Sequence, residues 1–574
     1  MFSLIWRWRF AARLLFHWQW YSKSNSELVW YCHADFPKQD WYDVLISEDF
    51  LRNHNGSQIK NGSHRSVSSF TIERDVYFIK NCKIGNARAF LREWLRPPKA
   101  KLEFDKAHQL REKNICTIVP MAWAIPPSFF PSSSFLLSKA IRGSISLEEI
   151  VTNLLNNRKN NFEEWSQLSS TLGRFVGLLH ENGVVHPDFH TGNLVFGGDQ
   201  SDQDKEWHLL DLHAVVIRNQ PVARKASLEN LAVFNRFFQL AVSPTVRLRF
   251  WYAYNQARKK IFSHNDLAQV EKMTNLSNRR FWSVRSKRYF GTNRTFIRIK
   301  KKNCVVHSRR VLEPSFIEKL IIDPDYPFYS QNVTVLKNSR SSFIVEIEVP
   351  TEGGIKKMVY KKINQKYWFS SLLNHFRISP LLRSWIFGNS LIDRYLPTPL
   401  PYLALYRRQL GFETEGYLLC EKLNDAIPLH QAIQNILQFQ QAQQFRSKQA
   451  LIIQLAQLIR QMHDRFISHR DLKSSNIFCQ IHNPKQFSIW FLDLVGVRSY
   501  RNLTSLRKNK DLMRLNVSFL NSRMISSTDK LRFLNAYFGR NWELRANWKT
   551  SWRIIERLSL EKTKRNLKMG RVIN

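Results

Sequence analysis

The 574-residue sequence contains no run of about 18 apolar residues, the length that a helix needs to cross a bilayer, so we expect no transmembrane helix. Its six cysteines are scattered and include no C-x-x-C pair, which argues against a zinc site or a disulfide framework and fits a reducing compartment. Acidic residues are scarce, because 46 Asp and Glu stand against 87 Lys and Arg. The net charge of +41 and the isoelectric point near 10.2 imply an anionic partner: nucleic acid, anionic lipid or an anionic substrate.

Two stretches combine this positive charge with aromatic residues. The first 20 residues contain no acid and place apolar and basic side chains on opposite helical faces. They predict an amphipathic helix at a membrane surface, a non-native extension, or a helix packed on the rest of the chain. Between Arg279 and Arg310 there are twelve basic residues, no acid and five interleaved aromatics, which indicates either a solvated face or an anion-binding surface. Tryptophan prefers the water–lipid interface, so the 18 tryptophans favour an anionic membrane surface, and we expect no nucleic acid partner.

The pattern H-x-D-x-x-x-x-N occurs twice, at residues 186–193 and 469–476. This is the spacing of a kinase catalytic loop, in which the aspartate orients the acceptor hydroxyl and accepts its proton. The asparagine five residues later holds magnesium on the nucleotide phosphates, and an aspartate on the next strand completes the metal site. The pattern therefore predicts catalytic bases at Asp188 and Asp471. The predicted metal ligands are Asn193, Asp211, Asn476 and Asp493.

A lysine at the end of a β-rich segment precedes each motif: Lys80 in the first half and Lys361, 281 residues later, in the second. Glu103 falls on the inward stripe of a helix, where a buried charge needs a partner. We therefore expect a Lys80–Glu103 ion pair that positions the nucleotide phosphates. The matching position in the second half is Ser384, and no acid occurs in residues 353–392. Because the second lysine lacks its acidic partner, we expect the first half to carry more of the turnover.

The distance between matching residues stays almost constant along the chain. Asp188 and Asp471 are 283 residues apart, and Asp211 and Asp493 are 282 apart. This regularity indicates a tandem duplication of one kinase-like unit. We predict an α+β protein with two tandem protein-kinase-like domains, each with a small β-rich N-lobe and a mainly helical C-lobe. The expected division is a basic aromatic segment over residues 1–30, a first domain over 31–325 and a second over 326–574.

The sequence resembles the lipopolysaccharide kinase family, which contains the Kdo and heptose kinases of the bacterial envelope. The resemblance covers most of residues 60–574 in two copies and is carried by the motifs above, with residues 117–122 and 396–401. It implies ATP and magnesium as cofactors and a hydroxyl of a lipid-linked saccharide as the acceptor. It also implies that Lys80, supported by Glu103, and Lys361 hold the nucleotide phosphates.

The first half departs from the family pattern at Pro187 and His190 in the loop and at His213 after the metal-binding aspartate. Neither half has a G-x-G-x-x-G loop, which disfavours a protein kinase. Two alternatives stay open: a kinase for a protein or a small hydroxylated molecule, and a pseudokinase scaffold that binds nucleotide or lipid. For a glycolipid kinase we expect a cytoplasmic protein, attached peripherally to the inner face of the cell membrane.

Overall fold

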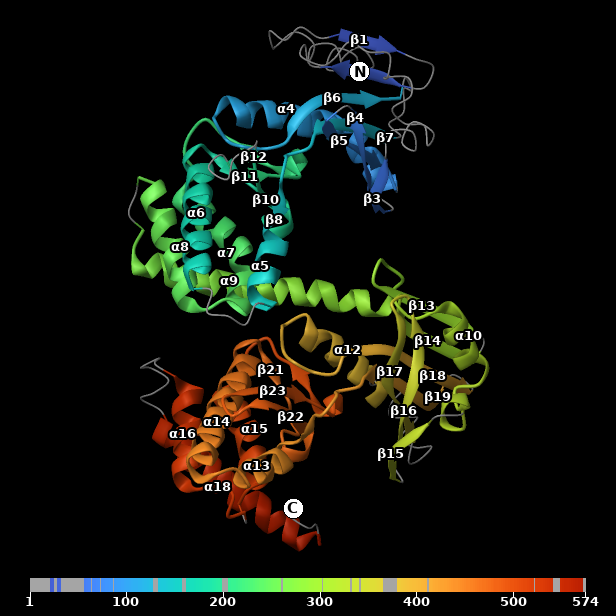
Figure 1. Cartoon of the computed structure of the whole chain (residues 1–574), viewed down its shortest axis with the longest axis vertical. Helices are drawn as coiled ribbons and strands as arrows, with labels where there is room; N and C mark the ends of the chain where they lie inside the picture. The colour runs from blue at the N-terminus through green and yellow to red at the C-terminus, as the bar shows by residue number, and fades with distance from the viewer. Residues whose placement is uncertain are drawn as a thin grey trace. The chain divides into compact units, whose positions relative to one another are not determined.

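The structure is a computed structural model of the chain (Figure 1). The residues that it describes are 21–24, 28–32, 56–62, 65–72, 74–85, 87–126, 133–156, 162–198, 205–259, 262–301, 303–330, 333–339, 342–364, 379–409, 412–520, 522–539 and 548–570. The amphipathic helix expected in the first 20 residues lies outside these ranges. The chain forms two compact units, residues 1–277 (unit 1) and 278–574 (unit 2), and their boundary falls inside helix α9 (His264–Ser286).

Unit 1 begins with a seven-stranded antiparallel sheet. Its strands are β1 (Tyr21–Ser24), β2 (Val29–Cys32), β3 (Ser57–Asn61), β4 (Arg65–Ile72), β5 (Asp75–Lys83), β6 (Val119–Ile125) and β7 (Ser133–Lys139). They are ordered β1-β2-β6-β7-β5-β4-β3. Side chains alternate between the two faces of a strand, so Tyr77 and Ile79 of β5 are buried in one face of the sheet while Lys80 points to the other.

Two helices, α3 (Ala87–Leu95) and α4 (Lys99–Glu112), lie in the chain between β5 and β6. Helix α4 packs on the sheet, because its Phe104 shares a buried cluster with Trp123 of β6 and Leu136 of β7. Glu103, next to Phe104, is also buried, with only 3% of its surface exposed. The packing of α4 therefore brings a carboxylate to the sheet.

The second lobe of unit 1 is mainly helical. Its helices are α5 (Leu147–Asn156), α6 (Phe162–Glu181), α7 (Arg224–Ala241), α8 (Pro244–Ala257) and the first part of α9. Short strands form two small sheets, one of β8 (Ile145–Ser146), β10 (Leu194–Gly197) and β11 (Glu206–Leu209) and one of β9 (Val184–Val185) and β12 (Val216–Ile217). Phe189, from the H-x-D-x-x-x-x-N segment, is buried in this lobe and stacks on Phe234 of α7 at 4.4 Å between ring centroids. The core therefore anchors the segment that carries Asp188.

Helices α6 and α8 approach closely because α6 presents glycine to α8. A Cβ on Gly177 would lie 2.5 Å from Ala257 Cβ and 3.0 Å from the Tyr254 carbonyl oxygen. We expect Gly177→Val to lower the stability of unit 1 by about 2–3 kcal/mol, because backbone atoms leave no room for the added side chain. Hydrogen exchange of α6 and α8 in the full chain measures this. Arg174→Val, on the exposed face of α6, is the control, and equal protection in both variants would contradict the close packing.

Unit 2 repeats the sheet. Its strands are β13 (Phe296–Lys301), β14 (Cys304–Arg309), β15 (Thr334–Ser339), β16 (Ser342–Thr351), β17 (Gly354–Asn364), β18 (Pro401–Gln409) and β19 (Phe412–Glu421). Their order, β13-β14-β18-β19-β17-β16-β15, is the order of unit 1 when the strands are counted along the chain. Helix α10 (Pro314–Ile322) follows β14, and α12 (Pro380–Ile392) takes the place of α4 between the fifth and sixth strands.

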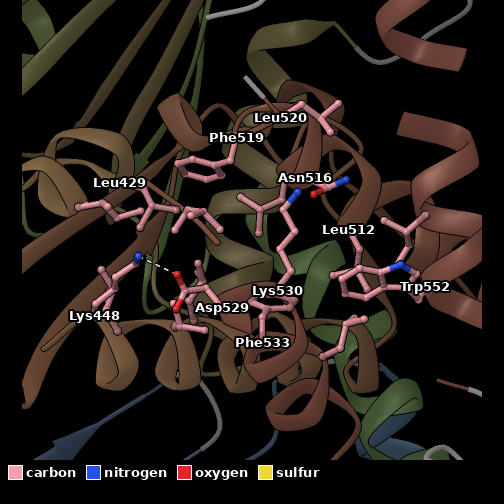
Figure 2. Close-up of a pocket in the computed structure, with 18 of the residues that line it drawn as sticks. Leu429, Lys448, Leu512, Asn516, Phe519, Leu520, Asp529, Lys530, Phe533 and Trp552 are labelled. Carbon is pink, nitrogen blue, oxygen red and sulfur yellow. Dashed lines mark ion pairs between the residues drawn. The ribbon is translucent and has the colours of Figure 1, made fainter. Parts of the chain in front are cut away.

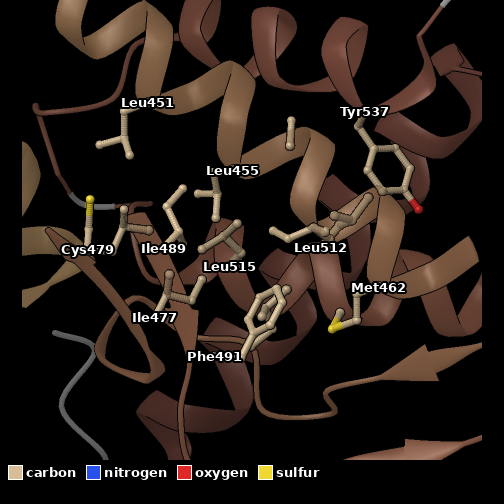
Figure 3. Packing of buried hydrophobic residues seen from close by; sticks show 14 of the residues in the cluster. Leu451, Leu455, Met462, Ile477, Cys479, Ile489, Phe491, Leu512, Leu515 and Tyr537 are labelled. Atoms are coloured by element: carbon tan, nitrogen blue, oxygen red, sulfur yellow. The ribbon is translucent and has the colours of Figure 1, made fainter. Parts of the chain in front are cut away.

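The helical lobe of unit 2 contains α13 (Leu429–Leu437), α14 (Gln441–Asp464), α15 (Ser505–Val517), α16 (Ser527–Phe538) and α18 (Trp548–Lys568). Figure 3 shows its core, in which Leu455 of α14 and Leu512 of α15 pack with Ile477 and Phe491. The predicted α+β class with two tandem kinase-like units is confirmed. Within the described ranges, no helix is long and apolar enough to span a membrane.

Each helical lobe also contains an apolar cavity at a matching place. In unit 2 it has a volume of about 150 Å³ and is lined by α13, α14, α15, α16 and α18, with a 2.6 Å ion pair between Lys448 and Asp529 in its wall (Figure 2). In unit 1 a cavity of about 50 Å³ is lined by α6 to α9. Leu172 of unit 1 and Leu455 of unit 2, 283 residues apart, both line these cavities. The duplication therefore extends to the packing of the core.

The boundary between the compact units differs from the one expected after residue 325. Strand β14 pairs with both β13 and β18, so residues 296–309 belong to the sheet of unit 2. The aromatic residues Trp282, Tyr289 and Phe296 of the basic stretch are buried, and the first two donate hydrogen bonds to Asp393. These three rings therefore lie in the interior of unit 2, and they face neither solvent nor an anionic surface, the two alternatives that the sequence pattern left open.

Candidate active site

The H-x-D-x-x-x-x-N segment of unit 1 is held by hydrogen bonds to its own backbone and to the strand that follows. His186 Nε2 lies 3.2 Å from the Leu210 carbonyl oxygen, and Asn193 Nδ2 donates to the Asp188 carbonyl oxygen at 2.9 Å. The side-chain nitrogen of Asn193 is engaged by this hydrogen bond, so its side-chain oxygen remains available to bind a ligand. The Asp188 side chain is 70% exposed and is free to meet a substrate hydroxyl.

Unit 2 repeats this arrangement almost atom for atom. His469 Nε2 lies 3.0 Å from the Leu492 carbonyl oxygen, and Asn476 Nδ2 donates to the Asp471 carbonyl oxygen at 2.9 Å. Asn476 Nδ2 also lies 3.0 Å from the Asp471 carboxylate, a contact without a counterpart in unit 1 among the bonds of the described residues. Both loops therefore have the shape that the sequence spacing predicts.

The residues that flank the two bases differ in type but occupy the same place. His190 Nε2 lies 3.6 Å from Asp188 Oδ2, and Lys473 Nζ lies 3.6 Å from Asp471 Oδ2. Both side chains are about half exposed. The departure from the family pattern at His190 therefore keeps a nitrogen beside the base.

The carboxylate of Asp211 lies at the centre of a charged cluster in unit 1. Lys80 Nζ lies 2.7 Å from Glu103 Oε2 and 2.8 Å from Asp211 Oδ1, so the expected contact between Lys80 and Glu103 is present. Arg65 Nη1 lies 3.1 Å from Asp211 Oδ2, and His213 Nδ1 lies 3.1 Å from Asp211 Oδ1. Strand β5, helix α4 and the turn after β11 thus bring their charged residues to one point.

Electrostatics keep Lys80 and Asp211 charged at neutral pH. Burial raises the pKa of Asp211, but the hydrogen bond with His213 and the charge of Lys80 outweigh it and hold the pKa far below its usual range. Burial lowers the pKa of Lys80, but the charges of Glu103 and Asp211 outweigh it and raise that pKa above its usual value. An ionised carboxylate and an amide oxygen are the hard donors that magnesium prefers, so Asp211 and Asn193 fit this metal.

The strand register identifies the matching residues of unit 2. Lys361 lies opposite Leu418 of β19, as Lys80 lies opposite Leu136 of β7. Asp493 adopts the same left-handed backbone conformation as Asp211, with φ of 55° and 59°. The backbone therefore places the lysine and the aspartate alike in the two units.

The side chains around them are not alike. Ser384 takes the place of Glu103, and Val495 takes the place of His213 as the second residue after the aspartate. Ser384 donates its hydroxyl to the Pro380 carbonyl oxygen of its own helix. Across the parts of unit 2 that the structure describes, no ion pair reaches Lys361 or Asp493. The predicted loss of the acidic partner of Lys361 therefore holds in the folded chain.

Two further residues support the loops, and the sequence pattern did not reveal them. Asp511 of α15 accepts hydrogen bonds from the backbone nitrogens of His469 at 2.9 Å and Arg470 at 2.8 Å. Arg470 has a φ of +64°, and this conformation turns its N–H toward the carboxylate. His463 Nε2 also lies 3.4 Å from Asp511, which is fully buried.

In unit 1, the residue 281 positions earlier is Asn230 of α7. Pro187 has no N–H to donate, so a carboxylate at position 230 would have fewer hydrogen-bond donors than Asp511 has. Asn230 instead donates to the His186 carbonyl oxygen at 2.7 Å and lies 3.0 Å from His180 Nε2. Burial lowers the pKa of His180 to about 4, so this ring is neutral. The sequence contains one sign of this difference: the unit with proline in its loop (Pro187) has asparagine at the supporting position (Asn230), and the unit with arginine (Arg470) has aspartate (Asp511).

Each unit thus combines a β-rich lobe, a helical lobe and a loop aspartate followed by an asparagine and a second aspartate, which together define a kinase fold. The model of the lipopolysaccharide kinase (Kdo/WaaP) family matches residues 54–270 and 355–537. The chain belongs to this family and contains two tandem copies of its kinase unit. No curated protein matches the chain.

Among solved structures, the chain is similar to WaaP in complex with acyl carrier protein. The two are 19% identical, with a TM-score of 0.31, and the match covers 39% of this chain and 90% of that chain.

Proposed function

We propose that this kinase transfers the γ-phosphate of ATP to a sugar hydroxyl of an envelope glycolipid of the lipopolysaccharide core type. The observation that carries the proposal is the contact of Lys80 with both Glu103 and Asp211 in unit 1. A lysine held in this way presents a fixed positive charge to the nucleotide phosphates, and positioning is the largest part of catalysis in phosphoryl transfer. Family membership supports the lipid-linked saccharide as acceptor.

The proposed reaction assigns one task to each residue. Lys80, fixed by Glu103, holds the α- and β-phosphates. Asp188 orients the sugar hydroxyl and accepts its proton while the hydroxyl oxygen bonds to the γ-phosphorus and the bond to the β-phosphate oxygen breaks. Asn193 and Asp211 would hold magnesium, which neutralises the phosphate charge when it is bound. In unit 2 the corresponding residues are Lys361, Asp471, Asn476 and Asp493.

Mass spectrometry of envelope glycolipids from cells with and without the gene tests the substrate class. We expect a species about 80 Da heavier, the mass of one added phosphate, only in cells that contain the gene, and its loss in the Asp188→Asn variant because the base is removed. An unchanged glycolipid profile together with a phosphorylated protein would identify a protein kinase instead. A chain that binds ATP without turning it over would be a pseudokinase scaffold.

We also propose that the protein attaches peripherally to the cytoplasmic face of the cell membrane. The basic side chains of Arg280, Lys287, Arg288, Arg298, Lys300 and Lys301 are exposed on unit 2 and support this location. Each basic residue near an anionic surface contributes about 1 kcal/mol.

We expect co-sedimentation with phosphatidylglycerol vesicles that weakens as salt rises, because salt screens the attraction. Vesicles of neutral phosphatidylcholine are the control and should bind far less protein. Equal binding to both vesicle types, or preferential binding to nucleic acid, would contradict the proposal.

A further inference from the structure

Arg65 is the first residue of β4, directly after the turn that joins it to β3. The backbone N–H of Gly62 donates to the Arg65 carbonyl oxygen at 2.9 Å, which closes this turn. In kinases, the turn between the two strands that precede the lysine-bearing strand usually carries a glycine-rich loop that covers the nucleotide phosphates. In this chain that turn joins β3 and β4. This chain has no such loop, and it places an arginine at the end of the turn.

The Arg65 guanidinium reaches across to the metal-binding carboxylate. Lys80 and His213 contact Asp211 Oδ1, and Arg65 contacts Asp211 Oδ2, so both oxygens of this carboxylate already face nitrogen atoms. A metal ion that binds Asp211 would lie beside these groups and would compete with them for the carboxylate oxygens.

Arg65 is the group with the most freedom to withdraw. The side chain of Lys80 is 15% exposed and is also held by Glu103, whereas that of Arg65 is 35% exposed. Within the described residues, Asp211 is the one acid that pairs with Arg65. A guanidinium that leaves a carboxylate is well suited to a phosphate, because its planar donors fit either anion with two parallel hydrogen bonds.

We propose that Arg65 is a phosphate-binding residue of unit 1, which neutralises Asp211 in the nucleotide-free protein and moves to the β- and γ-phosphates when ATP and metal bind. The inference rests on the proposed function, because it needs unit 1 to bind ATP. It gives the turn between β3 and β4 the role of a glycine-rich loop, with a side-chain cation in place of backbone N–H groups.

Unit 2 lacks this residue. Arg65 lies opposite Cys82 of β5, and the matching position, opposite Ile363 of β17, is Ser342. Ser342 is buried and its backbone N–H donates to Ser339 Oγ at 3.3 Å, so it offers no charge to Asp493. Among the residues that the structure describes, the proposed phosphate contact is therefore found in unit 1 only, and it adds to the difference between the two sites.

Binding measurements on the full chain test the proposal. Every protein carries Lys361→Ala, so that unit 1 dominates nucleotide binding. We expect Arg65→Ala to weaken ATP binding in the presence of magnesium by about 10- to 100-fold, the effect of one hydrogen bond to a charged group. AMP, which has no β- or γ-phosphate, should bind with unchanged affinity. Manganese, titrated without nucleotide, should bind several-fold more tightly because Asp211 has lost a competing cation.

The control is Arg142→Ala, which removes an arginine that pairs with Asp75, the first residue of β5, outside the site. It should alter none of the three affinities. Equal losses for ATP and AMP in Arg65→Ala would assign Arg65 a structural role and overturn the proposal, as would unchanged ATP or manganese affinity. Failure of the parent protein to bind ATP would refute the proposed function itself, which is a separate outcome.

Discussion

Asp188→Asn should remove most of the phosphate transfer, because replacing a positioned base slows its own unit by about 10²- to 10⁴-fold, whereas Asp471→Asn should leave a substantial fraction. Both substitutions remove a base from a loop of the same geometry. The difference comes from the lysines, because Lys80 is held by Glu103 and Asp211 while no ion pair reaches Lys361 among the described residues. An unheld lysine leaves the phosphates poorly placed, so unit 2 should contribute less turnover.

The catalytic loop of unit 2 favours the opposite ranking, in which unit 2 has the higher turnover. It has the arginine and lysine of the usual kinase loop, Arg470 and Lys473, and its Asp511 anchors two backbone N–H groups. We give the lysine pair more weight, because His190 stands as close to its base as Lys473 does.

Initial rates of phosphate transfer in the full chain, at saturating ATP, separate the two units. Lys80→Ala and Glu103→Ala should resemble each other, because the two residues act as one group, and the double variant should be little worse than either. Activity that survives Asp188→Asn and disappears with Asp471→Asn would show that unit 2 is the main catalyst.

Asp511→Ala should destabilise unit 2 by about 3–5 kcal/mol, the cost of removing one partner from a buried charged network. The substitution leaves the N–H groups of His469 and Arg470 without their acceptor, and an unsatisfied buried group costs about 1–3 kcal/mol. Asp511→Asn should also destabilise, because an amide NH₂ would face backbone donors. Asparagine is suitable in unit 1 because Pro187 has no N–H.

Two experiments measure this effect: urea denaturation gives the free energy of unfolding, and hydrogen exchange reports on residues 469–476. Asp464→Ala is the matched control: its carboxylate is 53% exposed and pairs with Arg460 on the surface, so its loss should cost about 1 kcal/mol or less. The hydrogen bond with His463 outweighs burial and lowers the pKa of Asp511, so the stabilisation is present above the unfolded pKa of about 4 and is lost as the pH falls below it. If the difference in stability between the wild type and Asp511→Ala does not decrease at acid pH, this account is contradicted.

The sequence was sufficient for the parts of the site that depend on local patterns. The strand that ends near Lys80, the inward position of Glu103 and both catalytic loops follow from the period of a strand or helix and from fixed motif spacing. The repeat distance then extended the predictions of the lysine and of the catalytic loop from unit 1 to unit 2. The assignment of unequal lysines also came from this comparison, because Ser384 stands where an acid was expected.

The sequence was not sufficient where distant segments meet. Strands β13 and β14 lie in a stretch rich in Arg and Lys, and the pairing of β14 with β18 joins residues about 100 positions apart, as in Val306 with Leu405 and Val305 with Tyr406. No sequence motif points to Arg65, because its contact with Asp211 crosses 146 residues of sequence. Asn230 and Asp511 carry no motif, and their role depends on which backbone groups the fold turns toward them.

The pairing of β14 with β18 also decides where the chain can be cut. A fragment beginning at residue 326 would contain β15 to β19 without β13 and β14, and would leave β18 as a bare sheet edge. The apolar residues Leu403 and Leu405 of this strand are fully buried beside β14 in the intact chain. An uncovered apolar edge pairs with other copies of itself, so such a fragment should aggregate during expression. A C-terminal half that keeps β13 and β14 in its sheet must begin before Phe296. The compact unit itself begins at Asn278, inside α9, well before the point at which the repeated motifs suggest a domain start.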